Sequence, residues 1–493
     1  MVTETPKPEA LDPAVKTPAD QGESPDSGAE VPAETAPSFY MNPDFDFAAL
    51  AESTDQKDVK DLCEYFGALS PVTTNEYTGL FKDYNLIMIC AESFSTYGIH
   101  PDLTPTLWDM AGNGIVLDNF YNSFPNTTTN GEFSFVAGLW PDVSRSAKLG
   151  SSVGSFAQSA ARYMPYAPGV LFEKAGYDTY AYHNYKGYYY RRKYTYPNLG
   201  YRNLKFMDEG MKFTTSWPSS DLEMFEQSVD DYLKNDKPFH AYYMTFSGHG
   251  PYTDANCIYR QNIDEVTAMT EGLYKVSYTL GYYCGELELE RAVTYLKKRL
   301  EEEGKLDKTV IVIVGDHYPY YLMKGAVREI VGGTMPDENF EKFKSTCIVY
   351  CGGIKEPIHV DEYCCNVDIL PTLYNLFDIP FDSRLLPGTD VFSDGVHCAR
   401  LYNGSFLTKF LKYDKPHGKV YYLDDYGSDE VMPENYLETM QDYTESKYAA
   451  SLTMMETDFF RLLYENSGYL TPEEAEAELA RQEKTKKQLE SGR

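Results

Sequence analysis

The chain has 493 residues, 42% of them hydrophobic, which is enough for an α/β domain with a large sheet and a sizeable core. The formal net charge of −31 would repel a polyphosphate, so nucleic acid is excluded as a partner held by bulk electrostatics. No apolar run is long enough to cross a bilayer, and the N-terminus lacks the basic and apolar regions of a signal peptide.

The first part of the chain, residues 1–38, is rich in Pro, Glu, Ala and Asp and has almost no aromatic residues. Such a segment cannot bury enough apolar surface to offset the entropy of ordering it, so we predict a disordered tether. Residues 39–83 are predicted to form a lead-in with a weakly helical region from Asp46 to Leu69.

Residues 84–398 alternate between strand-like and helix-like patterns. The continuous apolar runs Asn85–Ala91 and Thr309–Val314 are typical of strands covered on both faces. Further strands are predicted at Ile115–Phe120, Thr179–His183, Phe239–Phe246 and Ser345–Tyr350. Helices are predicted at Pro105–Gly112, Val170–Ala175, Ser220–Asn235, Val266–Glu303 and Val367–Phe377.

This alternation predicts an α/β fold with a large, mostly parallel sheet and helices on both faces. Ligands of such folds bind beyond the carboxyl ends of the strands. From residue 399 to residue 493 the pattern changes to short, tyrosine-rich strands, Leu407–Tyr413 and Lys419–Leu423, followed by two helices. We expect a small antiparallel subdomain there, with helices at Glu434–Ser467 and Pro472–Ser491.

Acidic and imidazole side chains directly follow the two clearest strands. Glu92 comes after the run that ends at Ala91, and Asp316 and His317 follow the second run. A carboxylate in this position is costly to bury unless it is paired or bound to a metal. The alternative interpretations are that Glu92 caps a helix and that Asp316 and His317 belong to a turn with an ordinary surface histidine. The shared strand end favours a metal site, and its oxygen-rich ligand set favours Mn²⁺, Mg²⁺ or Zn²⁺ over a structural zinc site.

Two further polar turns follow predicted strands. Thr128 lies in the polar segment Asn126–Phe133, where a threonine can cap a helix and also gain from the helix dipole as a nucleophile. His249 lies between two glycines, which let an imidazole approach a ligand closely. A flexible turn with an exposed histidine is the alternative interpretation, and we favour a functional role.

The segment from His183 to Lys193 mixes cations with aromatic residues, a combination suited to a phosphate and a polyol. We expect His183, Tyr189 and Arg191 to bind substrate here. The alternative is an exposed loop with surface tyrosines, since the chain contains 44 of them.

Taken together, these motifs resemble the lipoteichoic acid synthase branch of the alkaline phosphatase and sulfatase superfamily, from about Tyr84 to about Asp394. The resemblance is carried by the turn at Glu92, the T-x-N-x-E-F pattern that begins at Thr128, and two later segments, Ser247–Tyr252 and Gly315–His317.

The resemblance implies an alkaline phosphatase-like fold and one Mn²⁺-like ion held by Glu92, Asp316 and His317. It implies that Thr128 is both nucleophile and metal ligand, and that His249 and Arg191 contact the phosphate.

The sequence departs from the family in the loop after His183. Tyr189 stands where the synthases carry tryptophan. The loop is also one residue shorter than in the synthases, so Arg192 is the alternative to Arg191 as the arginine that contacts the phosphate. Asn184 or Tyr185 replaces an acidic residue that the synthases use near the glycerol. The Cys-x-Pro-x-Arg signature of true sulfatases is absent, so formylglycine chemistry is not expected.

By the same resemblance, the chain is expected to move a glycerol-phosphate type head group from an anionic, phosphatidylglycerol-like lipid to a cell-wall polymer or glycan. Such a donor places the enzyme on the extracellular face of a bacterial membrane, and we interpret the chain as an ectodomain without its membrane anchor or, alternatively, as a soluble relative. The alternatives are a phosphodiesterase or sulfatase-like hydrolase, a phosphoethanolamine transferase, and a non-catalytic glycan-binding surface protein.

Overall fold

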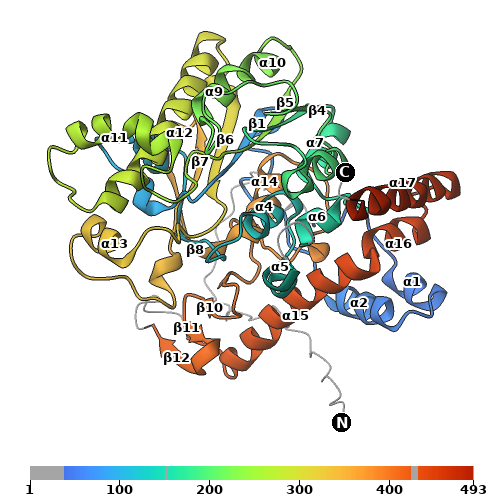
Figure 1. The fold of residues 1–493 in the computed structure, drawn as a ribbon. Coiled ribbons are helices and arrows are strands. Elements are labelled where there is room, and N and C mark those ends of the chain that lie inside the picture. Colours follow the sequence, from blue (N-terminus) through green and yellow to red (C-terminus); the bar gives the residue numbers. More distant parts are fainter. Residues whose placement is uncertain (1–37, 150–153, 424–430, 492–493) are drawn as a thin grey trace, which may run out of the picture.

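The computed structural model describes residues 38–149, 154–423 and 431–491 (Figure 1). Its centre is an eight-stranded sheet in the order β4-β3-β5-β1-β6-β7-β2-β8. Strand β7 runs antiparallel to both of its neighbours, and every other pair in this sheet is parallel. The predicted large, mostly parallel sheet is therefore confirmed. The tether predicted at residues 1–38 lies outside the described residues, except for Ser38.

The eight strands agree with the sequence pattern in the interior of the sheet and depart from it at the edges. Their bounds are β1 (Asn85–Ala91), β2 (Ile115–Tyr121), β3 (Asp178–His183), β4 (Asn203–Phe206), β5 (Phe239–Met244), β6 (Thr309–Gly315), β7 (Cys347–Cys351) and β8 (Ile358–Cys365). Strands β4 and β8 were not predicted. Both are edge strands with partly exposed residues, so neither shows the continuous apolar run of a central strand.

Helices cover both faces of the sheet, as predicted. Along β1, Leu86 and Met88 point into one hydrophobic cluster, whereas Ile87 and Ile89 point into the other. The first cluster is closed by α4 (Thr128–Ala137), α7 (Pro168–Lys174) and α14 (Ile369–Leu376). The second is closed by α3 (Pro105–Gly112), α9 (Asp221–Glu226), α10 (Val229–Leu233) and α12 (Ser277–Glu302).

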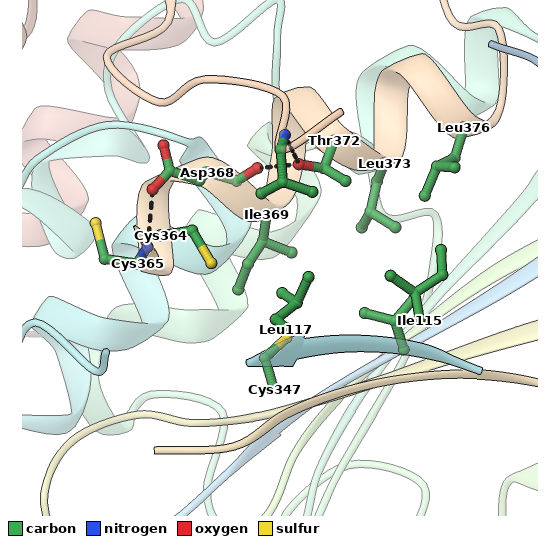
Figure 2. A pocket seen from close by; sticks show the side chains of 12 residues that line it. Ile115, Leu117, Cys347, Cys364, Cys365, Asp368, Ile369, Thr372, Leu373 and Leu376 are labelled. Carbon is green, nitrogen blue, oxygen red and sulfur yellow. Dashed lines mark hydrogen bonds between the residues drawn. The ribbon is translucent and has the colours of Figure 1, made fainter. Parts of the chain in front are cut away.

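Helix α14 packs on β2 and β7 around a small apolar cavity (Figure 2). Leu373 on the helix and Ile115 on the strand line it, together with Cys347, Cys364 and Cys365. These three cysteines are buried free thiols and act as small hydrophobic side chains.

The prediction of one continuous helix from Val266 to Glu303 is wrong, because the chain forms two helices here. The structure has α11 (Cys257–Met269) and α12, separated by a turn in which Glu271 and Gly272 have φ angles of 46° and 78°. These left-handed angles end the first helix. The apolar periodicity continues through the turn because both helices pack on the same core, and this is why the pattern did not show the break.

Two other predicted helices are also divided. The helix predicted at Glu434–Ser467 consists of α15 (Tyr436–Thr457) and α16 (Phe459–Asn466), joined at Asp458 with a φ of 55°. The segment that opens at Ser220 forms the short helices α9 and α10, and the Ser220 hydroxyl accepts a hydrogen bond from the backbone N–H of Glu223. Shorter helices complete the fold: α1 (Phe47–Ser53), α2 (Lys57–Ala68), α5 (Val143–Leu149), α6 (Ser155–Ser159), α8 (Arg192–Asn198) and α13 (Lys324–Ile330).

A separate four-stranded antiparallel sheet confirms the predicted C-terminal subdomain. It contains β9 (Ala399–Arg400), β10 (Phe406–Leu407), β11 (Leu411–Asp414) and β12 (Lys419–Tyr422). The predicted strand Leu407–Tyr413 is thus two strands, because the Thr408 hydroxyl accepts hydrogen bonds from the N–H groups of Phe410 and Leu411 and forms a turn.

The last helix, α17 (Pro472–Glu490), lies beside α16, and α1 and α2 pack against α15 and α16 (Figure 1). Within the described ranges, every helix is too short or too polar to span a bilayer.

Candidate active site

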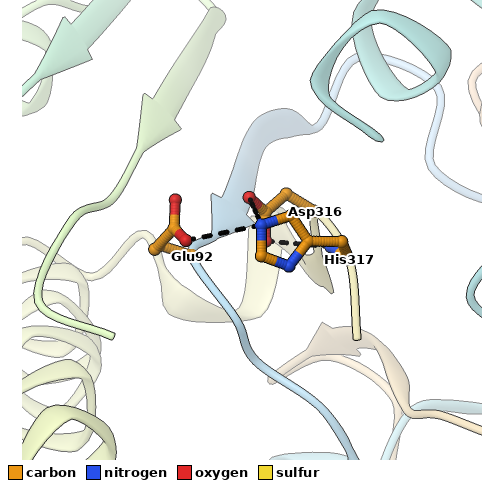
Figure 3. A group of neighbouring side chains, drawn as sticks. All are labelled: Glu92, Asp316 and His317. Atoms are coloured by element: carbon orange, nitrogen blue, oxygen red, sulfur yellow. Dashed lines mark hydrogen bonds and ion pairs between the residues drawn. The ribbon is translucent and has the colours of Figure 1, made fainter. Parts of the chain in front are cut away.

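Three of the predicted metal ligands meet at the carboxyl edge of the central sheet. Strands β1 and β6 are parallel neighbours, and Ala91 pairs with Gly315, so the next residues, Glu92 and Asp316, leave the sheet side by side. One ligand atom from each of Glu92, Asp316 and His317 lies within 4.8 Å of the other two (Figure 3). All three side chains are buried.

The hydrogen bonds around Asp316 leave one oxygen free for a ligand. Its Oδ1 accepts from the backbone N–H groups of Ser93 at 2.8 Å and of His317 at 2.9 Å. Its Oδ2 is buried and has no hydrogen-bond partner in the described part of the chain, although it lies 3.2 Å from Nε2 of His317, the third candidate ligand. Burial, and next the charge of Asp316, raise the pKa of Glu92 to about 8. Two facing buried carboxylates with an unpartnered oxygen fit a divalent cation. The positive charge would offset both the repulsion between the two carboxylates and the cost of removing them from water.

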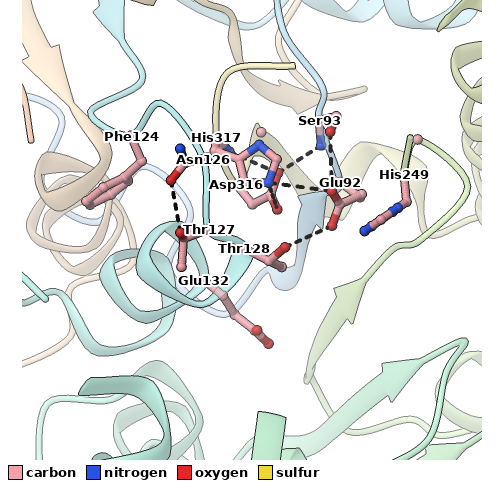
Figure 4. A network of polar contacts seen from close by, with 12 residues as sticks. Glu92, Ser93, Phe124, Asn126, Thr127, Thr128, Glu132, His249, Asp316 and His317 are labelled. Carbon is pink, nitrogen blue, oxygen red and sulfur yellow. Dashed lines mark hydrogen bonds and ion pairs between the residues drawn. The ribbon is translucent and has the colours of Figure 1, made fainter. Parts of the chain in front are cut away.

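Thr128 is the first residue of α4 and lies next to this group (Figure 4). Its Oγ1 donates a hydrogen bond of 3.1 Å to Oε2 of Glu92. The preceding residue, Thr127, has a left-handed φ of 74°, which turns the chain sharply into the helix. The hydroxyl is therefore held at a helix N-terminus, where the dipole favours developing negative charge.

Glycines bring separate segments into direct contact at the site. A Cβ atom on Gly131 of α4 would lie 1.8 Å from the carbonyl oxygen of Asp316. A Cβ atom on Gly248 would lie 2.0 Å from the carbonyl oxygen of Glu92. Only glycine allows these approaches, so the threonine helix and the histidine turn are fixed against the ends of β6 and β1 by backbone contact.

His249 follows β5 and lies next to Glu92 in Figure 4. Its Nδ1 is 2.5 Å from the carbonyl oxygen of Gly250, and burial lowers the pKa of the ring. The neutral imidazole therefore donates from Nδ1–H and keeps Nε2 for another partner. Its ring packs against Trp217 and Phe246, with centroid distances of 5.2 Å and 5.3 Å.

Trp217 was missed by the sequence analysis. Its ring also contacts Tyr185 at a centroid distance of 5.5 Å, so it joins the His249 turn to the loop that follows β3. The only signal in the sequence was an aromatic residue before the Pro-Ser-Ser segment that precedes α9, and nothing in that pattern places it beside His249.

His183 lies at the end of β3, but its ring nitrogens have partners within the protein. Nδ1 lies 2.9 Å from the carbonyl oxygen of Met244, and Nε2 lies 3.0 Å from Nη1 of Arg192. Burial, and next the charge of Arg192, hold the pKa of His183 well below its usual range. The neutral ring donates to Met244 and accepts from Arg192, so in this structure it orients an arginine rather than offering a free nitrogen to substrate.

The structure separates the two candidate arginines of this loop. Arg192 is 1% exposed and forms a bidentate pair with Glu132 of α4: Nε lies 3.1 Å from Oε1, and Nη2 lies 2.7 Å from Oε2. Arg191 is half-buried, has a left-handed φ of 69°, and makes no side-chain hydrogen bond or ion pair with the residues that are described. Tyr189 is also half-buried and packs edge-on against Tyr185 at 5.1 Å. Of these two arginines, Arg191 is therefore the one left available to an anionic ligand.

We expect Asp316→Asn to weaken binding of a divalent metal without unfolding the protein. The asparagine keeps the shape and one acceptor oxygen, but it loses the charge of the free Oδ2. Affinity for Mn²⁺ should fall by about 100-fold or more, because mutating a residue that only hydrogen-bonds to a metal ligand already lowers metal affinity by roughly 10- to 100-fold. Metal content per chain and thermal melting provide the check. Asp390→Asn, at a buried carboxylate outside the site, is the matched control. Unchanged Mn²⁺ binding by Asp316→Asn would rule out this ligand set.

Comparison with known proteins places these residues in a family context. The family model described as Sulfatase matches residues 84–379. The lipoteichoic acid synthase of Staphylococcus aureus (strain NCTC 8325 / PS 47) is 27% identical over 367 residues, which cover 70% of this chain and 53% of the relative. The chain thus spans about half the length of the curated relatives it matches. The predicted resemblance to these synthases is confirmed.

Solved structures show the same fold. The lipoteichoic acid synthase LtaP from Listeria monocytogenes has a TM-score of 0.64 and 18% identity, over 80% of this chain and 98% of that one. A protein of the alkaline phosphatase superfamily from Vibrio parahaemolyticus has a TM-score of 0.58 and 16% identity, over 84% of this chain and 96% of that one. The fold is alkaline phosphatase-like, and because the family model matches more than half of the sequence, the chain belongs to the sulfatase family of enzymes.

Proposed function

We propose that the chain is a metal-dependent phosphotransferase with Thr128 as its nucleophile. It moves a glycerol-phosphate type head group from a phosphatidylglycerol-like lipid to a hydroxyl of a cell-envelope polymer or glycan, on the outer face of a bacterial membrane. The observation that carries the proposal is the 3.1 Å contact between Thr128 Oγ1 and Glu92, within a buried group that fits a divalent cation. The donor, acceptor and location are proposed from the similarity to lipoteichoic acid synthases.

Glu92, Asp316 and His317 would hold the ion, with Thr128 as a further ligand and Mn²⁺ as the proposed metal. Such an ion lowers the pKa of a bound hydroxyl and neutralises charge on a phosphate oxygen. Glu92 orients the Thr128 oxygen, which attacks phosphorus while the diacylglycerol oxygen leaves. A phosphoglycerol ester on Thr128 results, and the acceptor hydroxyl then displaces the threonine.

His249 is proposed to transfer the protons at Nε2, because Nδ1–H is held by the Gly250 carbonyl. In the first step, Nε2 takes the proton of the Thr128 hydroxyl and passes it to the leaving diacylglycerol oxygen. In the second step, Nε2 takes the proton of the acceptor hydroxyl and passes it to the Thr128 oxygen as that oxygen leaves phosphorus. The guanidinium of Arg191 binds the phosphate oxygens, and Tyr189 packs against the glycerol carbons. His183 supports this loop by holding Arg192.

Incubation with lipid vesicles of defined head group, with and without Mn²⁺, tests the proposal. We expect mass spectrometry of the peptide that contains Thr128 to show a phosphoglycerol adduct with phosphatidylglycerol and Mn²⁺, and no adduct with phosphatidylcholine or in Thr128→Ala. An adduct from phosphatidylethanolamine alone would reassign the head group. Release of glycerol phosphate to water at the same rate with and without acceptor would make the enzyme a hydrolase.

A further inference from the structure

One fully buried carboxylate has no role in the site described so far. Asp221, the first residue of α9, is 0% exposed. Burial raises its pKa to about 6, so a charge at this position is costly. Its side-chain partners in the described part of the chain are two backbone N–H groups and one amide, and none of them is a cation. A buried acid of this kind is retained where hydrogen bonds compensate it, so these partners show what it does.

One oxygen of this carboxylate joins the two loops that carry the proposed substrate contacts. Its Oδ1 accepts hydrogen bonds from the backbone N–H groups of Phe246 at 2.9 Å and of Ser247 at 3.2 Å, in the turn that follows β5. It also accepts from Nδ2 of Asn184 at 2.7 Å, at the start of the loop that follows β3. His249 belongs to the first of these loops and Arg191 to the second.

The backbone before Asp221 repeats this connection. The N–H of Asp221 donates to Oγ of Ser247 at 2.9 Å, and that hydroxyl donates to the carbonyl oxygen of Ser219 at 3.3 Å. The same carbonyl accepts from Nδ2 of Asn184 at 3.0 Å. Trp217, two residues before Ser219, packs against a ring in each loop. The segment from Trp217 to Asp221 therefore contacts both loops through side chain and backbone.

The contact with Phe246 leads directly to the catalytic turn. The N–H of Phe246 donates to Asp221, and its carbonyl oxygen accepts from the backbone N–H of His249 at 3.1 Å. The Phe246 ring packs on His249 and on Tyr185, with centroid distances of 5.3 Å and 5.2 Å. Asn184 immediately precedes Tyr185 in the chain. A shift of either loop would therefore break a hydrogen bond to the same buried oxygen.

We propose that Asp221 is a positioning residue, which holds the His249 turn and the Arg191 loop in one fixed placement relative to each other. This inference rests on the proposed function, in which the imidazole and the guanidinium act on the same phosphate. Asp221 acts through the backbone of the turn and through Asn184, and it neither binds the substrate nor transfers a proton. Placement of this kind matters because a displacement of about 1 Å at a reacting group can lower a rate by roughly 100-fold.

The kinetics of donor cleavage on phosphatidylglycerol vesicles test the two arms of this network. Asp221→Ala removes the acceptor of both loops, so the maximal rate should fall by roughly 10- to 100-fold and the half-saturating lipid concentration should rise about tenfold. Asn184→Ala breaks only the arm to the arginine loop. It should raise the half-saturating concentration about tenfold and keep the maximal rate within about threefold.

Two further variants separate positioning from stability. Asp221→Asn keeps Oδ1 as the acceptor, and Oδ2 has no hydrogen-bond partner to lose among the described residues, so both constants should stay within about threefold. Glu290→Ala is the matched control, because Glu290 is 5% exposed and accepts from the N–H groups of Thr106 at 2.9 Å and Leu107 at 3.0 Å, outside the site. It should lower the melting temperature as Asp221→Ala does, and cleave the donor like the wild type.

Hydrogen exchange gives a readout that does not depend on activity. In Asp221→Ala, the amides of residues 246–249 and of residues 185–191 should both exchange about tenfold faster or more, although the second segment makes no hydrogen bond to Asp221. Asn184→Ala should accelerate only the second segment, and Glu290→Ala should accelerate neither.

Each outcome decides for or against the placement. Unchanged exchange of residues 185–191 in Asp221→Ala, or kinetics equal to those of Glu290→Ala, would overturn it. An Asp221→Asn as slow as Asp221→Ala would overturn the role of the shared oxygen. If Asp221→Ala does not fold, Asn184→Ala decides, and unchanged exchange and half-saturation there count against the inference. If the wild type cleaves no lipid, the proposed function fails, and the placement is then judged by hydrogen exchange alone.

Discussion

Thr128→Ala is expected to abolish turnover, with a fall of about 10⁴-fold or more, while the protein remains folded. The hydroxyl is the only atom of this residue that can attack phosphorus, and losing a nucleophile of this kind removes the covalent route entirely. The structural cost is small, because the side chain gives up one hydrogen bond to Glu92, worth about 1 kcal/mol. The rate of donor cleavage and the melting temperature are the two measurements.

The neighbouring threonine provides a matched control. Thr129 is buried in the same helix turn, and its Oγ1 has no hydrogen-bond partner among the described residues. Thr129→Ala should therefore keep wild-type activity, and Thr128→Ser should keep a measurable part of it. If Thr129→Ala is inactive and Thr128→Ala is active, the nucleophile has been assigned to the wrong residue.

The second large effect is expected from the two adjacent arginines, which should respond in opposite ways. Arg192→Ala leaves the carboxylate of Glu132 buried without its cationic partner, so the free energy of unfolding should fall by about 3–5 kcal/mol. Arg191→Ala removes no side-chain hydrogen bond or ion pair within the described part of the protein. It should melt like the wild type but lose activity by roughly 10- to 100-fold, the effect of one charge-assisted hydrogen bond.

Two further variants separate stability from substrate binding. Arg191→Lys should recover only part of the activity, because an ammonium cannot reproduce the fork of the guanidinium. Arg192→Met combined with Glu132→Gln should recover stability relative to Arg192→Ala, because no unpaired charge is left buried. A folded but inactive Arg192→Ala, together with a fully active Arg191→Ala, would mean that Arg192 is the residue that meets the phosphate.

The strands of the central sheet could be predicted from sequence because burial on both faces leaves a local pattern. The bounds predicted for β1, Asn85–Ala91, agree with the structure, and Glu92 and Asp316 could be placed together because parallel strands end at one edge. Edge strands such as β8 have no such pattern. Helix breaks such as the turn at Gly272 depend on backbone angles that hydrophobic periodicity does not report.

Side-chain partners were harder to foresee than strand positions. The T-x-N-x-E-F pattern contains Glu132, yet its pairing with Arg192 links positions 60 residues apart and has no local signature. The same is true of Nδ1 of His183, because its partner, the carbonyl oxygen of Met244, lies 61 residues away in the chain. Sequence reasoning thus identified residue types suited to phosphate chemistry, but it could not tell which cations were already neutralised.

The backbone contacts at Gly131 and Gly248 have a consequence for redesign. The threonine helix and the histidine turn touch the ends of β6 and β1 through main-chain atoms at these glycines, so the spacing of the candidate centre is set there by the backbone. The loop from His183 to Lys193 carries no such contact at Tyr189 or Arg191. Grafting only the segment from Lys186 to Arg191 from a relative with another head-group preference should therefore change the substrate while leaving the reactive centre in place, provided that His183 and Arg192 are retained as its anchors.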